Sequence, residues 1–287
     1  MIPALGFGTA AIMGRISRRR GAEALERAHA AGIRHFDTAR SYGWGEAERV
    51  VGDFLRGHAR AEIRVVSKCG IVPVRPSPFL SAAKSAARWV LAFAPGLKAQ
   101  VARAAGAEGF QPTRTYDLDV LAGSLQTSLA ELGLSYLDDL LLHNFMPGAP
   151  GVEEVGQWFR ILKGAGTIRR FGFSVEGDLR QGLEFLSAKH LLADSIVQVP
   201  VSDFLLDLPK EWRGVRFIAH SPFSFLRRQA EAKGSFSTLT DLLQALDEAC
   251  ICEALVCSMF DAGHLEANVA AWRRCSSGSR RSAQQAL

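Results

Sequence analysis

Short apolar runs alternate with longer amphipathic segments along most of the chain. Between the apolar runs, hydrophobic residues recur at helical spacing, as in GAEALERAHAAG (21–32) and VLAGSLQTSLAELG (120–133). Gly32 and Gly133 end these two helices, where a positive φ is needed, and Asp178 is placed to cap a third. The apolar runs predict eight β-strands, at residues 5–9, 34–39, 63–68, 137–143, 168–174, 196–201, 215–220 and 254–259.

The spacing of these strands predicts the fold. Four of the intervals between successive strand starts are 28 to 31 residues long. Eight β–α units of about thirty residues are typical of a (β/α)8 TIM barrel of about 250 residues. The alternative is a doubly wound open sheet, which carries a Gly-rich turn after its first strand. Gly6 and Gly8 lack the third glycine of that motif. We therefore predict one α/β barrel domain over residues 1–272.

One interval between strands, after the third, is 74 residues long. It contains an excess of about 45 residues, which we assign to a helical insertion at 73–117 in the third βα loop. This loop lies on the face where barrel active sites form, so the insertion is either a substrate lid or a neutral addition to the rim. The last segment, 273–287, is small, polar and basic and is predicted to be a disordered tail.

Composition and charge narrow the classes of function. The chain of 287 residues is 48% apolar and 22% charged, which is ordinary globular composition. The net charge is +5, but without the four arginines of the tail it is +1, so no nucleic-acid partner is expected. The most apolar stretch, 89–97, is too short to span a membrane.

The five cysteines and the first residues indicate the compartment. The cysteine count is odd and its spacing fits neither a disulfide framework nor a zinc site, so we expect reduced thiols and no metal. The opening MIPALGFGTA lacks the pattern of a signal peptide. We expect a cytoplasmic protein that does not bind membranes and is a monomer or weak homo-oligomer.

Charged and polar side chains follow three successive strands. Asp37 lies near the end of the second strand, Lys68 ends the third and His143 the fourth, while Tyr42 lies five residues after Asp37. Each residue alone has an ordinary structural explanation as a cap, a surface lysine or a core histidine. The C-terminal ends of barrel strands meet at one mouth, however, so the four are expected to converge there.

The chain resembles the aldo-keto reductase superfamily over about residues 4–270. The matching text is LGFGTA, AAGIRHFDTARSYGWGEAERVVGDFL, VVSKCG, SLAELGLSYLDDLLLH, IRRFGFS, IVQVPVS and AHSPF. The long third loop and the first third of the chain are similar to the bacterial branch that acts on sugars and small aldehydes. The resemblance implies an NAD(P)-dependent oxidoreductase that moves a hydride between nicotinamide and the carbonyl or alcohol carbon of an aldehyde, ketone or sugar.

The resemblance also implies a catalytic tetrad of Asp37, Tyr42, Lys68 and His143. Tyr42 is expected to act as the general acid or base, with its pKa lowered from about 10 by the Lys68 ammonium. Asp37 would hold Lys68 charged and in place. His143 would donate a hydrogen bond that orients the substrate carbonyl.

Cofactor contacts are implied at several further positions. Gln198 and Ser174 match nicotinamide ligands of the family, but Val175 replaces the asparagine that usually follows the serine. His220 stands where an aromatic residue commonly stacks on nicotinamide, and a bulky loop at 223–226 replaces a glycine-containing one. The remaining matched positions are Ser221, Pro222, Phe223, Ser258, His264 and Asn268.

Cofactor choice and substrate contacts are the least defined. His264 stands where the family often has an arginine that binds the 2′-phosphate, and this replacement removes a reason to prefer NADP(H). Both cofactors therefore stay open, with NADP(H) slightly favoured over NAD(H) on family grounds alone. Trp44 and Phe145 are candidate substrate contacts, with ordinary packing as the alternative. The arginines at 15 and 18–20 border the mouth, where they either attract an anion or form a solvated helix start.

Two hypotheses therefore remain. The first is a reductase or dehydrogenase acting on a small carbonyl or sugar substrate. The second is a catalytically weak or inactive barrel that binds cofactor and serves a regulatory role, as the substitutions at Val175, His220 and 223–226 suggest. Binding of reduced cofactor without its oxidation by carbonyl compounds would favour the second.

Overall fold

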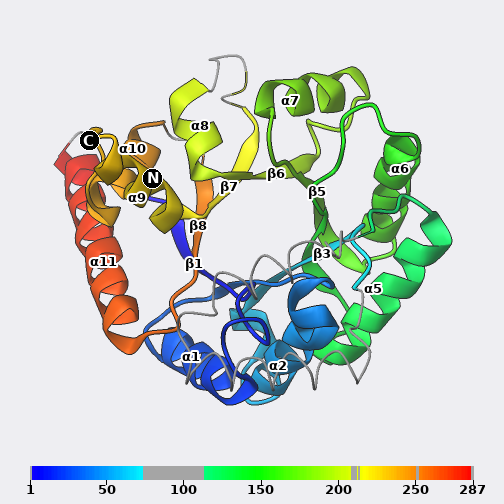
Figure 1. Ribbon diagram of the computed structural model, residues 1–287, viewed down its shortest axis with the longest axis horizontal. Helices are drawn as coiled ribbons and strands as arrows, with labels where there is room; N and C mark the ends of the chain where they lie inside the picture. The colour runs from blue at the N-terminus through cyan, green and yellow to red at the C-terminus, as the bar shows by residue number, and fades with distance from the viewer. Residues whose placement is uncertain (1, 74–112, 208–211, 213, 250–251, 286–287) are drawn as a thin grey trace, which may run out of the picture.

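The eight predicted strands form one closed, parallel barrel in the order β1 to β8 (Figure 1). The computed structural model describes residues 2–73, 113–207, 212, 214–249 and 252–285. Each strand lies within two residues of its predicted start. The strands are β1 (Ala4–Gly8), β2 (His35–Asp37), β3 (Arg64–Cys69), β4 (Leu137–Leu142), β5 (Ile168–Ser174), β6 (Ser195–Pro200), β7 (Arg216–His220) and β8 (Cys252–Cys257).

Helices surround the barrel, as the amphipathic segments predict (Figure 1). Gly32 and Gly133 have φ values of 96° and 67°, which confirms their predicted role after helices. The Asp178 carboxylate accepts a hydrogen bond from the Gln181 amide and caps its helix. The helices are α1 (Arg18–Ala30), α2 (Glu46–Leu55), α5 (Leu118–Leu132), α6 (Val152–Gly164), α7 (Leu179–Ala188), α8 (Val201–Asp207), α9 (Pro222–Glu231), α10 (Leu239–Ala249) and α11 (Ala262–Gln285), with short 3-10 helices η1 (Tyr42–Gly45) and η2 (Arg60–Glu62).

The insertion and the tail are the two segments in which the prediction is not confirmed. The predicted insertion at 73–117 falls mainly on residues 74–112, which lie outside the described residues. The prediction of a disordered tail from residue 273 is wrong at its start, because α11 continues to Gln285. The Arg273 guanidinium donates to the Ala31 carbonyl, and the Ser277 hydroxyl donates back to the Arg273 carbonyl, so the helix is anchored beyond the predicted boundary.

The inside of the barrel is divided into three layers because alternate strand residues point inward. The middle layer is apolar: Ile196, Ile218, Ala254 and Val256 form a cluster separate from the main core. The main core lies between the strands and the helices and contains most of the buried phenylalanines. Two residues after Ile196, Ile218 and Val256 stand the polar residues Gln198, His220 and Ser258, which line the mouth.

The opposite end of the barrel holds a layer of ion pairs. Asp139 accepts from Arg64 Nε (2.6 Å) and Arg170 Nε (2.8 Å), and Arg170 also donates to Glu253 (2.9 Å). Glu253 is the extra residue of a β-bulge, because the pairing of β7 with β8 shifts between Phe217 and Ile218. Because the bulge locally changes the alternation of inward and outward side chains along β8, Glu253 can reach these arginines.

Among the described residues, no helix combines the length and the apolar character needed to cross a bilayer.

Candidate active site

The structure brings the four predicted tetrad residues together at the mouth. Lys68 Nζ donates to Asp37 Oδ1 (2.6 Å) and to the Thr38 carbonyl (3.0 Å), and lies 3.4 Å from the Tyr42 hydroxyl. The Tyr42 and His143 rings meet edge to face with centroids 5.6 Å apart. Lys68 and Asp37 are buried, at 2% and 4% exposed, so their interaction is only weakly screened by solvent.

The expected lowering of the tyrosine pKa is not found in this arrangement. Burial raises the pKa of Tyr42 above its usual value, and the neighbouring Asp37 carboxylate raises it further. The Lys68 ammonium acts in the predicted direction and lowers it, but burial outweighs this effect. Burial also lowers the pKa of Lys68, although Asp37 and Tyr42 more than offset this and raise it overall. Tyr42 is therefore a protonated group beside a firmly charged lysine.

Both histidines of the mouth are held neutral. Burial, with help from the Lys68 charge, places the pKa of His143 well below 6.5. Burial likewise lowers the pKa of His220 to about 4, although Asp37 opposes this. The Ser41 hydroxyl lies 3.3 Å from His143 Nδ1, and a hydroxyl that donates there leaves the ring proton on Nε2.

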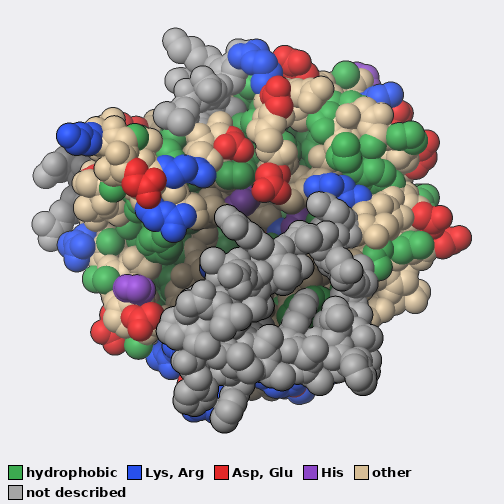
Figure 2. Space-filling view, in the orientation of Figure 1, with side chains coloured by type: hydrophobic (Ala, Val, Ile, Leu, Met, Phe, Trp, Pro, Cys, Tyr) green, Lys and Arg blue, Asp and Glu red, His purple; other side chains and the backbone are tan. Residues whose placement is uncertain are grey.

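A cavity of about 480 Å³ opens at the mouth. Figure 2 shows a hollow at the centre of the molecule with histidine side chains visible in it. Asn144 and Glu176, which the prediction did not assign to the site, also line this cavity, as does Arg15, which the prediction placed at the border of the mouth. Asn144 and Glu176 lie two residues after the ends of β4 and β5, and this position at the strand ends is the signal that would have found them. The predicted residues on the lining are Asp37, Tyr42, His143, Ser174, Gln198, His220, Ser221, Pro222, Phe223 and Ser258.

Four predicted contacts are not on this lining. Phe145 is 3% exposed and packs on Phe173 and Phe185 in the main core, which corrects its assignment to the substrate pocket. Trp44 lies in η1 but not on the cavity. The His264 side chain is 85% exposed at the start of α11, and Asn268 is buried one turn later. Of the four arginines near the mouth, Arg18 and Arg19 instead pair with acids, and only Arg15 lines the cavity.

The valine after Ser174 is explained by strand alternation. Val175 is buried and turns away from the mouth towards Gly182 of α7. On the mouth side, the Ser174 hydroxyl donates to Asn144 Oδ1 (2.9 Å), and the Asn144 amide donates to Glu176. The side-chain amide of Asn144, at the end of the neighbouring strand β4, therefore lies beside Ser174, although the residue that follows Ser174 in the chain is a valine.

The bulky sequence after β7 is a helix rather than a loop. α9 begins at Pro222 directly after Ser221, whose φ of 60° turns the chain sharply. Proline suits a first helical position because its missing N–H needs no partner there. Phe223 and Ser224 of the first turn line the cavity. Backbone N–H groups and the helix dipole at such a start favour an anion.

A buried ion network supports the loop that carries Tyr42. The Arg40 guanidinium donates to Glu48 (2.8 Å), to Glu131 (2.8 Å) and to the Gly45 carbonyl at the end of η1 (3.1 Å). The Glu48 side chain is fully buried and also accepts from the Ser67 hydroxyl (2.6 Å). No sequence pattern predicted this network, because its members are spread over 91 residues of the chain.

We expect Arg40→Leu to destabilise the protein by about 3–5 kcal/mol, because it leaves the Glu48 carboxylate buried without its cation. Urea unfolding would measure the loss. Arg49→Gln is the matched control, since Arg49 contacts the same Glu131 from an exposed position (side chain 44% exposed) and should cost less than about 1 kcal/mol. Equal losses in the two variants would contradict a structural role for the buried network.

The depressed pKa of His220 gives a pH prediction. The unfolded chain protonates this histidine near pH 6.5, whereas the folded chain does so only near pH 4. Unfolding therefore takes up a proton between these values, and this contribution to stability is lost as the pH falls from 6.5 towards 4. We expect His220→Phe to reduce the fall in unfolding free energy over this window by up to about 1.4 kcal/mol per pH unit. Parallel curves for wild type and variant would show that His220 titrates normally.

The structure is an eight-stranded parallel barrel in which a tyrosine, a lysine, an aspartate and a histidine lie together at the mouth formed by the C-terminal ends of the strands. This combination of fold and site defines a class of protein. The sequence profile of the Aldo/keto reductase family matches residues 4–250, and the chain belongs to this family.

Curated relatives match parts of the chain. D-threo-aldose 1-dehydrogenase of a Pseudomonas species is 42% identical over 80 residues, which cover 27% of this chain and 24% of that protein. NADH-specific methylglyoxal reductase of Escherichia coli is 26% identical over 209 residues, which cover 68% of this chain and 57% of that protein. The matches thus span about a quarter to just over half of these relatives.

Solved structures share the fold. An aldo-keto reductase from Bacillus halodurans superposes with a TM-score of 0.64 at 20% identity, covering 93% of this chain and 85% of the other. One from Klebsiella pneumoniae, in complex with NADP and acetate, has a TM-score of 0.59 at 21% identity and covers 94% of this chain and 86% of the other.

Proposed function

We propose that this chain is an NAD(P)-dependent oxidoreductase that interconverts the carbonyl and alcohol forms of an aldehyde, ketone or sugar. The observation that carries the proposal is the contact of Tyr42 with the buried Lys68–Asp37 pair, beside His143 and on a cavity of about 480 Å³. Family membership supports the reaction class, and the relatives named aldose dehydrogenase and methylglyoxal reductase support small carbonyl or sugar substrates.

Nicotinamide supplies the hydride when it is bound. In the direction of reduction, the raised pKa of Tyr42 keeps its hydroxyl protonated and ready to donate to the substrate oxygen. As the proton leaves, the Lys68 ammonium 3.4 Å away stabilises the phenolate. The neutral His143 donates a hydrogen bond to the same oxygen and orients the carbonyl. In oxidation, the same groups act in reverse.

The mouth suits a nicotinamide dinucleotide. Ser174, Asn144 and Gln198 offer hydroxyl and amide groups to a carboxamide, although Gln198 Nε2 also donates to Asp37 Oδ2 (2.7 Å). The start of α9 and the Arg15 guanidinium offer positive charge to phosphate groups. The choice between NADP(H) and NAD(H) stays open: a neighbouring structure holds NADP, and one relative is named NADH-specific. NADP(H) remains our expectation.

Fluorescence titration with NADPH and NADH tests the proposal. We expect at least one reduced cofactor to bind with a micromolar dissociation constant and to be oxidised when methylglyoxal or a small aldose is added. Tight binding without oxidation by any carbonyl would favour the alternative, a regulatory barrel, and would overturn the enzymatic assignment. Failure of both cofactors to bind would contradict both functions. Ser174→Ala removes the hydroxyl that we assign to the nicotinamide carboxamide, so it should weaken cofactor binding without abolishing it.

A further inference from the structure

Gln198 makes a hydrogen bond across the inside of the barrel, directly below the mouth. Its side-chain nitrogen donates to Asp37 Oδ2 (2.7 Å), and the two residues are 161 positions apart in the chain. Gln198 lies on β6 and Asp37 ends β2, and these two strands stand on opposite sides of the closed barrel. Both side chains are buried, at 2% and 4% exposed, so solvent weakens this bond little.

The bond restricts how the Asp37 carboxylate can turn. Oδ2 accepts from Gln198, whereas Oδ1 accepts from Lys68 Nζ (2.6 Å). Because each oxygen has its own donor on a different side chain, a rotation of the carboxylate breaks the geometry of both bonds. Asp37 therefore holds Lys68 in one direction as long as Gln198 holds Asp37.

The direction of the Lys68 ammonium matters for Tyr42. An ammonium group has three donors, and Lys68 Nζ directs them at Asp37 Oδ1 (2.6 Å), the Thr38 carbonyl (3.0 Å) and the Tyr42 hydroxyl (3.4 Å). The contact with Tyr42 is the longest of the three, so it is the first to be lost when Asp37 turns. Gln198 thus acts on Tyr42 through two intervening side chains.

We propose that Gln198 is a positioning residue for proton transfer: by holding Asp37, it keeps the Lys68 ammonium directed at the Tyr42 hydroxyl. This role rests on the oxidoreductase function proposed above. It also fixes the orientation of the Gln198 amide, because an ionised carboxylate accepts hydrogen bonds and cannot donate them. The amide nitrogen therefore faces Asp37, and the amide oxygen is the acceptor that remains for a cofactor carboxamide in the mouth cavity, which Gln198 lines.

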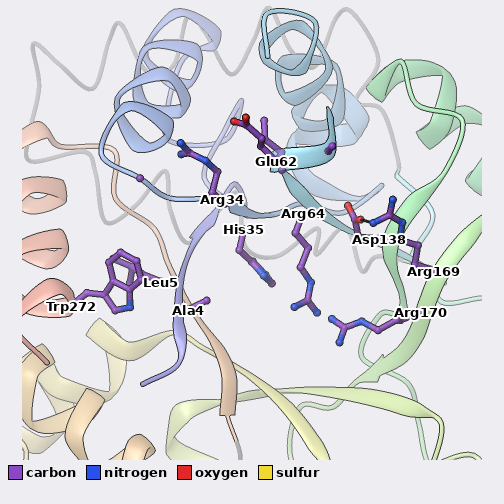
Figure 3. Close-up of a pocket in the computed structure, with 13 residues that line it drawn as sticks. Ala4, Leu5, Arg34, His35, Glu62, Arg64, Asp138, Arg169, Arg170 and Trp272 are labelled. Atoms are coloured by element: carbon purple, nitrogen blue, oxygen red, sulfur yellow. Dashed lines mark ion pairs between the residues drawn. The ribbon is translucent and has the colours of Figure 1, made fainter. Parts of the chain in front are cut away.

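The barrel has other cross-links that do not involve Gln198. At the end opposite to the mouth, Arg64 and Arg170 point towards each other (Figure 3) and pair with Asp139 and Glu253. These ion pairs connect β3, β4, β5 and β8. We therefore expect substitutions of Gln198 to leave the barrel folded, so that their effects report on the site.

Three variants test the proposal in a carbonyl reduction assay at saturating cofactor. Gln198→Met keeps a similar shape without a donor or an acceptor, and its kcat should fall about 10- to 100-fold with little change in KM for the carbonyl substrate. Gln198→Glu keeps an acceptor oxygen, but it can donate to Asp37 only while its carboxyl is protonated. Ser195→Ala is the matched control, because it removes a buried hydroxyl at the other end of β6, and it should leave kcat unchanged.

The pH profile separates positioning from a contact with the cofactor alone. Burial holds the pKa of His143 well below 6.5 and that of His220 at about 4, and the pKa of Tyr42 lies above its usual value, so these groups keep their charge from pH 6 to 9. Repulsion by Asp37 raises the pKa of the carboxyl introduced by Gln198→Glu. At pH 6 this variant should therefore exceed Gln198→Met in kcat by at least about fivefold, and the advantage should be lost at pH 9.

Two kinetic results would overturn the proposal. The first is a Gln198→Met variant that binds cofactor more weakly but keeps the wild-type kcat at saturation, because Gln198 would then be a cofactor contact only. The second is an advantage of Gln198→Glu that is equal at pH 6 and pH 9, because an acceptor oxygen alone would then explain it.

Crystal structures of the wild type and of Gln198→Met test the proposal without turnover. In the variant we expect the Asp37 carboxylate to turn and Lys68 Nζ to lie further from the Tyr42 hydroxyl than the 3.4 Å seen here. An unchanged separation would overturn the proposal. A wild type that oxidises no reduced cofactor with any carbonyl compound, together with a displaced Lys68 in the variant, would contradict the proposed reaction and leave the positioning of Lys68 by Gln198 standing.

Discussion

Tyr42→Phe is expected to lower the rate of carbonyl reduction by about 10²–10⁴-fold, the range that general acid catalysis contributes. The variant lacks the Tyr42 hydroxyl, which lies 3.4 Å from Lys68 Nζ, at a residue that lines the mouth cavity. It keeps the aromatic ring that meets His143 edge to face, so the shape of the site is retained. Steady-state oxidation of the reduced cofactor at saturating carbonyl substrate measures the effect.

Cofactor affinity is the control for this variant. None of the groups that we assign to the dinucleotide is altered by Tyr42→Phe, so its dissociation constant should change by less than about twofold. A variant that turns over at the wild-type rate would exclude Tyr42 as the proton donor. A large loss of cofactor binding would mean that the variant reports on structure rather than on proton transfer.

Lys68→Met is expected to have the second large effect, and it should lower the stability of the protein as well as the rate of carbonyl reduction. It removes the cation that Asp37 contacts at 2.6 Å in a buried site. A buried carboxylate left without its partner costs about 3–5 kcal/mol. Activity should also fall by several orders of magnitude, because the developing phenolate of Tyr42 loses its stabilising charge. Urea unfolding and turnover are measured on the same sample.

The double variant Asp37→Asn/Lys68→Met separates the two effects. It replaces the ion pair with two neutral groups. The amide oxygen introduced at position 37 can still accept from Gln198 Nε2, which donates to Asp37 in the wild type (2.7 Å). We expect most of the lost stability to return while activity stays low, since the charge near Tyr42 is still missing. Recovery of both properties would mean that Lys68 acts only by supporting the fold.

Much of the fold follows from local pattern. β5 was predicted at its observed bounds, because its apolar run begins after a helix end and stops at a serine. The polar strand-end residues were also predictable, since alternation along parallel strands directs them to one mouth. Phe145 was misassigned because an aromatic residue beside a site faces either the cavity or the helices, and only packing decides which. Residues of the 74–112 segment are not described, so the lid hypothesis stays a prediction.

The sequence by itself determined the number and order of the strands, the polar groups at their ends and the family. These are properties of local alternation and spacing, which a linear pattern records. Only the tertiary structure decided which distant groups interact and how burial changes their pKa values. Barrel closure brings Gln198 to Asp37 across 161 residues, buries Tyr42 enough to raise its pKa, and gathers Arg64, Asp139, Arg170 and Glu253 into one layer. Burial and distance between remote residues set these effects, and neither is encoded in any single segment of the chain.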